Sequence, residues 1–254
     1  MQTIDILKDI GKRCDGDIYL GVVGPVRVGK SSFIKRFMEK AVIPYIDNPD
    51  AKIRATDELP QSGEGKMIMT VEPKFVPNQA AHIQIEDNLG VNIRLVDCVG
   101  YVIDGAKGYQ DEQGIRYVKT PWYLEAIPFD EAAKIGTQKV IQDHSTIGIV
   151  MTCDGSICEI PGADYVQATD DVIRELKEIG KPFVIVVNSK DPQSLQCNQL
   201  VEDLKEKHDV PVMALRVTEM NEEDITHLLK EALYEFPIHE VKIEVPRWIA
   251  LMDS

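Results

Sequence analysis

One eight-residue motif near the N-terminus constrains the fold more than any other feature of the sequence. Residues 24–31 read G-P-V-R-V-G-K-S and fit the pattern G-x-x-x-x-G-K-[ST]. The apolar run at residues 18–24 predicts a strand before the motif, and Phe33, Ile34 and Phe37 at helical spacing predict a helix after it. A glycine-rich loop between a strand and a helix can close its backbone N–H groups around phosphates. The motif therefore predicts an α/β domain that binds a nucleotide.

Strand-like and helical patterns alternate along the rest of the chain. Strands are expected at residues 147–152, 183–188 and 212–217, and helices at residues 168–179, 194–208 and 222–234. Alternating residues at 82–85 and 91–97 flank a short turn and predict an antiparallel hairpin. We expect an α/β fold of the P-loop NTPase class, GTPase-type (TRAFAC-like), with a mostly parallel sheet, one antiparallel hairpin strand and helices on both faces. Residues 47–76 and 100–128 fit no regular element.

Length and composition fit one α/β domain. The chain has 254 residues, of which 44% are hydrophobic and 28% charged, so it can bury a full core. We expect residues 1–240 to form the P-loop domain and residues 241–254 to begin a following, truncated domain, because a strand-like run and Trp248 stand close to the end. No signal peptide or membrane-spanning apolar run is recognisable, so a cytosolic location is expected.

The net charge and the cysteine content limit the kinds of partner and metal site that the sequence predicts. The formal net charge of -14 repels phosphate backbones, which argues against nucleic-acid binding. The five cysteines are odd in number and lack Cys-x-x-Cys spacing, so neither a disulfide framework nor a zinc site is expected. Small molecules and proteins are the expected partners.

The loop residues have distinct expected roles. Gly24 and Gly29 let the backbone approach the phosphates, Lys30 bridges the outer phosphates, and Ser31 ligates magnesium. The expected nucleotide-binding residues of the loop are Gly24, Val28, Gly29, Lys30, Ser31 and Ser32.

Two later segments carry further candidates. Asp97 ends an apolar strand in the run D-C-V-G, which resembles the D-x-x-G switch of GTPase-type proteins. Its carboxylate is expected to hold the magnesium shell, with Gly100 free to approach the terminal phosphate. Thr70 ends the flexible run at residues 62–70 and is the candidate sensor that completes magnesium coordination, although a strand threonine would also fit.

Charge neutralisation during hydrolysis needs a separate candidate. Tyr101 stands where many small GTPases carry a water-orienting glutamine. Arg27, inside the loop, could stabilise the developing charge, as an arginine at the same place does in the guanylate-binding proteins. A solvated loop residue is the alternative interpretation of Arg27.

A base-reading element is suggested after the strand at residues 183–188. The run N-S-K-D at residues 188–191 is similar to N-K-x-D, with Asn188 and Asp191 correctly spaced and the lysine one place late. The displaced lysine leaves guanine selectivity open. A simple turn after a strand would also explain these residues.

Several runs together resemble one family. They are G-P-V-R-V-G-K-S at 24–31, D-E-L-P-Q-S at 57–62, T-V-E-P-K-F-V-P-N-Q at 70–79, D-C-V-G-Y at 97–101, T-P-W-Y at 120–123, H-S-T-I-G at 144–148 and E-A-L-Y-E-F-P at 231–237. In these runs the chain resembles the stage IV sporulation protein A family of spore coat morphogenetic ATPases, over nearly its whole length.

The resemblance implies an activity, a location and partners. It implies a domain that binds ATP with Mg2+ and uses hydrolysis to drive its own irreversible assembly into the basement layer of the spore coat. The family works in the mother-cell cytosol, peripherally on the forespore outer membrane, with a small amphipathic membrane-anchoring peptide and other spore coat proteins. Membrane placement in the family needs a C-terminal region that this chain lacks.

The family's site maps onto this chain residue by residue. Lys30 and Ser31 match its nucleotide grip, Asp97 its magnesium carboxylate, and Thr70 the first of two sensor threonines, the second of which is Val71 here. Two rival functions remain open. One is a regulatory GTPase switch that recruits a protein partner, and the other is a structural scaffold that binds nucleotide for stability only.

Overall fold

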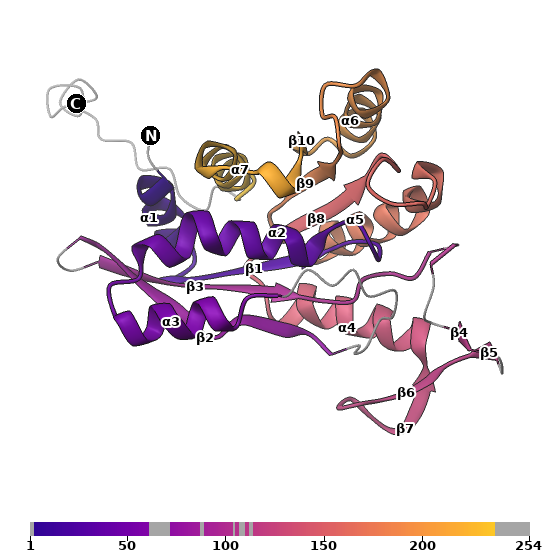
Figure 1. Ribbon diagram of the computed structural model, residues 1–254, viewed down its shortest axis with the longest axis horizontal. Coiled ribbons are helices and arrows are strands. Elements are labelled where there is room, and N and C mark those ends of the chain that lie inside the picture. Colours follow the sequence, from indigo (N-terminus) through magenta and orange to yellow (C-terminus); the bar gives the residue numbers. More distant parts are fainter. Residues whose placement is uncertain are drawn as a thin grey trace, which may run out of the picture.

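A six-stranded sheet forms the centre of the computed structural model, which describes residues 3–60, 72–86, 89–103, 105–106, 110–111 and 114–236 (Figure 1). The order across the sheet is β10-β9-β8-β1-β3-β2. The strands are β1 (Asp17–Val23), β2 (Lys74–Glu86), β3 (Leu89–Asp97), β8 (Ile147–Cys153), β9 (Phe183–Asn188) and β10 (Val212–Leu215). The first strand therefore lies in the middle, with later strands added on both sides.

The pairing of the strands confirms a mostly parallel sheet with one antiparallel pair. β1 runs parallel to β3 and β8, β9 runs parallel to β8 and β10, and only β2 is antiparallel, to β3. Every residue of β8 and β9 is buried. Strands covered on both faces need such continuous apolar runs, which is why their patterns predicted them well. The predicted hairpin is present, although β2 begins at Lys74 rather than near His82.

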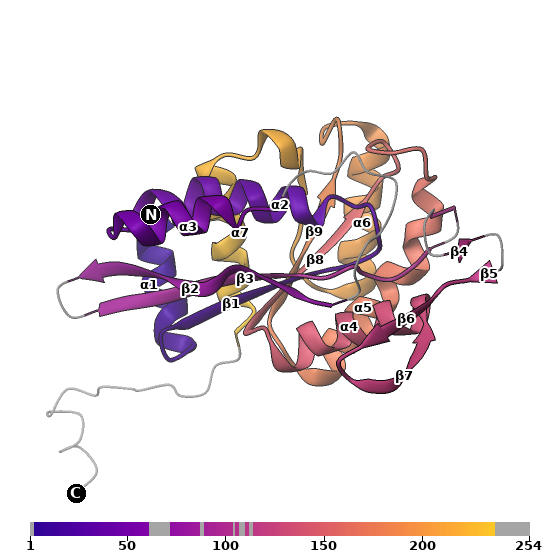
Figure 2. The same cartoon turned by 60° about the horizontal axis from the view of Figure 1, so that its bottom comes forward.

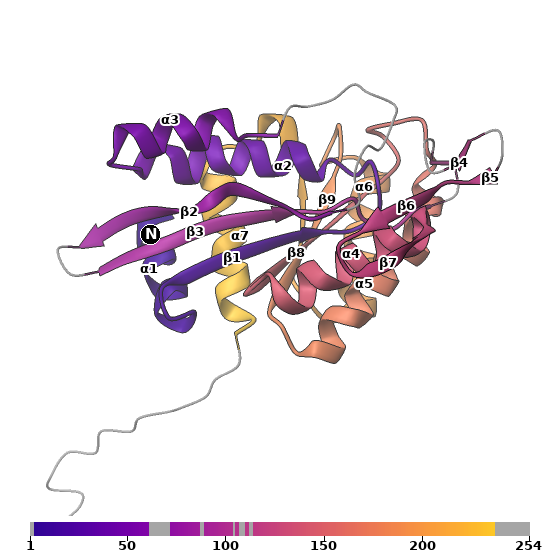
Figure 3. The same ribbon diagram turned by 90° about the horizontal axis from the view of Figure 1, so that it is seen from below.

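Helices cover both faces of the sheet, as predicted. α1 (Thr3–Arg13), α2 (Lys30–Phe37) and α7 (Glu222–Tyr234) pack on one face, whereas α4 (Phe129–Asp143) and α5 (Val166–Ile179) pack on the other. Figure 3 shows α2 and α3 (Pro49–Asp57) on the opposite side of the sheet from α4 and α5. α1 approaches so closely that a β-carbon on Gly11 would come within 2.4 Å of Val91 Cγ1.

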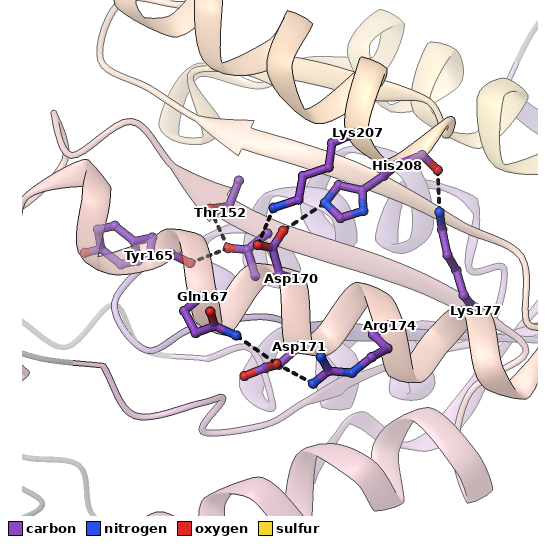
Figure 4. A network of polar contacts seen from close by, with 10 residues as sticks. Thr152, Tyr165, Gln167, Asp170, Asp171, Arg174, Lys177, Lys207 and His208 are labelled. Atoms are coloured by element: carbon purple, nitrogen blue, oxygen red, sulfur yellow. Dashed lines mark hydrogen bonds and ion pairs between the residues drawn. The ribbon is translucent and has the colours of Figure 1, made fainter.

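A polar network fixes α6 (Leu195–His208) beside α5 (Figure 4). Asp170 of α5 accepts a hydrogen bond from Lys207 at 2.6 Å, and its second carboxylate oxygen lies 2.9 Å from His208 Nε2. Burial lowers the pKa of His208, although the neighbouring Asp170 opposes this shift. Between α5 and the sheet, the buried hydroxyls of Thr169 and Thr152 lie 2.9 Å apart and join α5 to β8.

Two segments expected to lack regular structure contain it. Within residues 47–76, α3 forms because Asn48 accepts hydrogen bonds from two backbone N–H groups of its first turn and Pro49 opens the helix. Residues 100–128 contain β4 (Gln110–Asp111), β5 (Gly114–Ile115), β6 (Tyr117–Thr120) and β7 (Tyr123–Pro128), in two small antiparallel pairs. The prediction of irregular structure was wrong for these parts.

Other expectations concern the chain ends and the membrane. Residues 241–254, expected to begin a following domain, lie outside the described residues. Within the described ranges, no helix combines the length and apolar character needed to cross a bilayer.

Candidate nucleotide site

The predicted site residues gather at the carboxyl edge of the sheet. The predicted phosphate loop, residues 24–31, leaves β1, while Asp97 ends β3 and Asn188 ends β9. β1 lies between β3 and β8 in the sheet. The chain leaves β1 toward the face covered by α2, whereas it leaves β3 and β8 toward the opposite face, covered by α4 and α5 (Figure 3). Open α/β sheets bind ligands in the crevice at such a switch point.

The phosphate loop lies tightly against the neighbouring strands. A β-carbon on Gly24 would come within 2.1 Å of Met151 O, and one on Gly29 within 2.4 Å of Asn188 Nδ2. Both glycines have positive φ, 134° and 94°. Only glycine allows this backbone path without strain.

Lys30 is held inside the loop. Its side chain is only 5% exposed, and Nζ donates hydrogen bonds to Pro25 O at 2.6 Å and Gly24 O at 3.3 Å. Burial lowers the pKa of Lys30. A β-carbon on Gly100 would lie 2.5 Å from Lys30 Nζ, so the loop after Asp97 closes over the ammonium. In the part of the chain that the structure describes, the ammonium hydrogen-bonds to two backbone carbonyls, and a buried ammonium of this kind is suited to an anionic ligand.

Ser31 and Asp97 form the second half of the site. Ser31 Oγ donates to Asp97 Oδ2 at 2.7 Å, and Asp97 Oδ1 is buried without a hydrogen-bond partner among the described residues. Burial raises the pKa of Asp97, while the bond from Ser31 and the charge of Lys30 lower it. A hydrated cation would satisfy the orphaned oxygen and favour the ionised carboxylate. A hydroxyl and a carboxylate beside the predicted phosphate loop are oxygen donors of the kind that magnesium takes.

Open space adjoins this pair. A cleft of about 620 Å3 is lined by Ser31, Asp97, Glu58 and Lys74, among others. No group of three or more His, Cys, Asp or Glu side chains placed for a metal was found in the described part of the chain. A cation at Ser31 would therefore depend on phosphate oxygens for much of its coordination.

Tyr101 ties the loop after Asp97 to the phosphate loop. Its carbonyl accepts from Val26 N at 2.9 Å, and its N–H donates to Gly24 O at 3.2 Å. The buried side chain reaches α5, where the hydroxyl donates to Glu175 Oε1 at 2.5 Å. Burial, with this bond, raises the pKa of Tyr101, so the hydroxyl stays protonated. Tyr101 thus clamps two loops and a helix together.

The structure separates the two candidate base-reading residues. Asn188 is 6% exposed, and its Nδ2 donates to Val28 O at 2.9 Å while its Oδ1 accepts from Val217 N at 3.2 Å. Asn188 therefore holds the phosphate loop to the segment after β10. Asp191 is exposed, and its Oδ1 accepts from Gln193 N at 3.2 Å.

A buried aspartate and the serines hydrogen-bonded to it were missed by the sequence patterns. Asp154, directly after β8, accepts from Ser189 Oγ at 2.6 Å and from Ser156 N at 2.9 Å. Ser156 Oγ in turn accepts from Lys190 N at 2.9 Å. These bonds fix the loop after β9 against the loop after β8. The available signal was an aspartate that directly follows a fully apolar strand.

The remaining predicted residues are only partly located. Arg27 is exposed at the tip of the phosphate loop with a φ of 64°, and Ser32 is half-buried in the first turn of α2. Thr70 and Val71 lie outside the described residues. The sensor role of Thr70 and the charge-stabilising role of Arg27 stay predictions.

Comparison with known proteins decides the family. The family model described as "Stage IV sporulation protein A, ATPase domain" matches residues 1–237. The chain belongs to this family. It is 58% identical over 254 residues to stage IV sporulation protein A of Bacillus subtilis (strain 168), and 56% identical over 254 residues to that of Bacillus anthracis. These alignments cover 100% of this chain and 52% of each relative.

A more distant relative gives the same result. The chain is 52% identical over 245 residues to stage IV sporulation protein A of Clostridioides difficile (strain 630), which covers 96% of this chain and 50% of the relative. The chain thus spans about half the length of the curated relatives it matches. The family's ATPase-domain description indicates ATP as the nucleotide that the domain binds.

Proposed function

We propose that this chain is a magnesium-dependent P-loop ATPase domain of the GTPase-type class that hydrolyses ATP to ADP and phosphate. The observation that carries the proposal is that Lys30 and Asp97, two largely buried charged side chains, lie close together beside the predicted phosphate loop. Among the described residues, the hydrogen bonds of the Lys30 ammonium go to two backbone carbonyls, and Asp97 beside Ser31 keeps a buried oxygen without a hydrogen-bond partner. A magnesium-bound triphosphate supplies both missing partners, anionic oxygens for the first and a hydrated cation for the second.

The chain's own residues account for binding and orientation. The loop N–H groups and the N-terminus of α2 hold the phosphates, and Lys30 leaves its carbonyl partners for the outer phosphate oxygens. Ser31 and Asp97 would hold Mg2+, which neutralises phosphate charge when bound. Attack by water on the terminal phosphorus then breaks the bond to the bridging oxygen and releases ADP. Arg27, exposed at the loop tip, is the candidate for stabilising charge in that step.

A second candidate function, a regulatory GTPase switch, differs from the ATPase in the nucleotide that it selects. The spacing of Asn188 and Asp191 favours a regulatory GTPase switch that recruits a protein partner. Against it, Ser189 uses its hydroxyl on Asp154, and the lysine of the element stands one place late. The ATPase description of the family model also supports ATP.

The biological role that we propose is hydrolysis-driven self-assembly into the basement layer of the spore coat. The names of the relatives, stage IV sporulation protein A, support a role in sporulation. We propose that the whole protein acts in the mother cell, peripherally on the forespore membrane. There it would meet a small amphipathic membrane-anchoring peptide and other coat proteins.

Phosphate release with ATP and with GTP, each with Mg2+, tests the proposal. The ATPase predicts faster release from ATP, and an Asp191→Ala variant with unchanged selectivity. The matched control is Asp203→Ala, which removes a carboxylate from α6, away from the phosphate loop. Faster release from GTP that depends on Asp191 would replace the proposal with the GTPase switch.

A further inference from the structure

The hydroxyl of Tyr101 is engaged on α5, outside the phosphate loop. Tyr101 directly follows the D-C-V-G run, where many small GTPases carry a glutamine that orients the attacking water. Its side chain is only 7% exposed, and the hydroxyl donates a hydrogen bond to Glu175 Oε1 at 2.5 Å. With the hydroxyl held there, Tyr101 does not supply a water-orienting group. Its influence on the reaction therefore passes through its backbone.

The backbone of Tyr101 is fixed to the phosphate loop. Its N–H donates to Gly24 O, and its carbonyl accepts from Val26 N. Gly100, the preceding residue, has a φ of 89°, and a β-carbon there would lie 2.0 Å from Gly24 O and 2.5 Å from Lys30 Nζ. Gly100 is also the residue expected to approach the terminal phosphate. A shift of Tyr101 would therefore displace the backbone that lies beside Lys30.

Glu175 holds Tyr101 from the far side of the sheet. Figures 2 and 3 show α4 and α5 side by side on the face opposite α2. Glu175 Oε1 accepts from Tyr101 and also from Gln138 Nε2 of α4 at 2.9 Å. A hydroxyl-to-carboxylate bond as short as that of Tyr101 is of the charge-assisted kind, roughly twice as strong as a neutral one.

The second oxygen of Glu175 argues against a purely structural role. Glu175 Oε2 is buried and has no hydrogen-bond partner among the described residues. A buried oxygen without a partner costs free energy, and a neutral side chain could join α4 to α5 without that cost. The need for a carboxylate is explained if its strong bond to Tyr101 serves the nucleotide site.

The connection from α5 to the nucleotide site is continuous. Glu175 holds the Tyr101 hydroxyl, and the Tyr101 backbone is bonded to the phosphate loop beside Lys30. We propose that Glu175 is a positioning residue for ATP hydrolysis, which acts through Tyr101 to hold Gly100 in place over the phosphate loop. Misplacement of such a group by about 1 Å can slow a reaction roughly 100-fold. This inference rests on the proposed function and deepens it, because it assigns a role to a helix outside the loop.

Steady-state ATP hydrolysis by Tyr101→Phe and by Glu175→Gln is the test, together with equilibrium binding of ATP. Both changes keep the size of the side chain and weaken the same hydrogen bond. Each should lower kcat by about tenfold or more and change the affinity for ATP by less than about twofold, because the bond positions a group for the transition state. Parallel losses of turnover and affinity, or wild-type turnover in both variants, would overturn the role of Glu175.

Two control variants separate positioning from stability. Gln138→Leu removes the other hydrogen bond to Glu175 and leaves the bond from Tyr101. Tyr165→Phe deletes the hydroxyl of another buried tyrosine, which lies 2.9 Å from Cys158 Sγ just before α5. All four variants weaken one hydrogen bond, so thermal melting should be slightly lower in each, but both controls should keep kcat within about twofold of the wild type. A loss of kcat in Gln138→Leu equal to that in Glu175→Gln would assign the effect to helix packing and overturn the proposal.

The double variant Tyr101→Phe/Glu175→Gln tests whether the two residues act as one unit. Its kcat should be within about twofold of the slower single variant, because one hydrogen bond carries both effects. A loss equal to the product of the two single losses would overturn action through Tyr101. A wild-type chain that releases no phosphate from ATP would overturn this proposal and the proposed function together. Hydrolysis by the wild type with unchanged kcat in the variants would overturn only the role of Glu175.

Discussion

Polar residues are usually exposed and apolar residues buried, and two regions depart from this in opposite ways: the candidate nucleotide site at the carboxyl ends of the parallel strands, and the β6–β7 hairpin. At the candidate nucleotide site, charged and polar groups are buried, including Lys30, Asp154 and Asn188. On the hairpin, Tyr117 and Leu124 are large, apolar and exposed. Single exposed apolar residues are common, whereas buried charge needs an explanation. We interpret the buried polar groups as a place for an ionic ligand.

The largest predicted effect tests whether the buried carboxylate serves the ligand or the fold. Asp97→Asn should lower Mg2+-dependent ATP hydrolysis by about 100-fold or more, because it removes the charge that holds the cation. Burial raises the pKa of Asp97, so ionising it costs the folded state and the variant should melt no lower than the wild type. Phosphate release and thermal melting measure the two effects, with the exposed Asp191→Asn as control. A variant that melts lower and hydrolyses normally would contradict our interpretation.

Asn188→Ala tests whether the buried Asn188 side chain stabilises the fold around the candidate nucleotide site. The change leaves Val28 O and Val217 N without their buried partner, so the free energy of unfolding should fall by about 1–3 kcal/mol. Urea denaturation measures this loss. The exposed Asp191→Ala should change the free energy of unfolding by less than about 0.5 kcal/mol. Equal losses in the two variants would mean that Asn188 does not tie the loops together.

Arg27→Ala distinguishes a catalytic arginine from a solvated one. A side chain that stabilises charge only in the transition state should lower kcat by roughly tenfold and leave the affinity for ATP nearly unchanged. Steady-state kinetics and equilibrium binding of ATP measure these quantities separately. Parallel losses of turnover and affinity would assign Arg27 to ground-state binding.

The smallest predicted effect concerns the hairpin. Leu124→Ser should change the free energy of unfolding by less than about 0.5 kcal/mol, since its side chain is fully exposed. Leu20→Ala, in the middle of the core, should cost about 2–5 kcal/mol. Chemical denaturation of the two variants side by side makes the comparison. A large loss for Leu124→Ser would mean that the hairpin residue packs within the chain.

Local sequence patterns predicted the elements whose signal is local. The expected strand at residues 183–188 coincides with β9, because a fully buried parallel strand is one continuous apolar run. The helix α3 was missed because only Ala55 is buried on it, so it has little hydrophobic periodicity and depends on its cap. The hairpin was missed because residues 123–126 of β7 are all exposed, so its sequence does not show the alternation of a half-buried strand.

The candidate site was predictable only in part for a related reason. The phosphate motif is contiguous, so Gly24, Lys30 and Ser31 could be assigned from spacing alone. The bond between Ser189 and Asp154 joins residues 35 positions apart, and nothing in the sequence around either residue indicates its partner. Asn188 was recognised as a candidate, but its hold on Val28 follows from the fold.

The most direct test of the central claim is the initial rate of phosphate release from ATP and Mg2+, measured for the wild-type chain beside Lys30→Ala. Lys30 is the buried ammonium whose carbonyl partners a triphosphate would replace. Our account predicts steady release by the wild type and a loss of about 100-fold or more in the variant. Equal rates in the two proteins, or no release by the wild type, would contradict it.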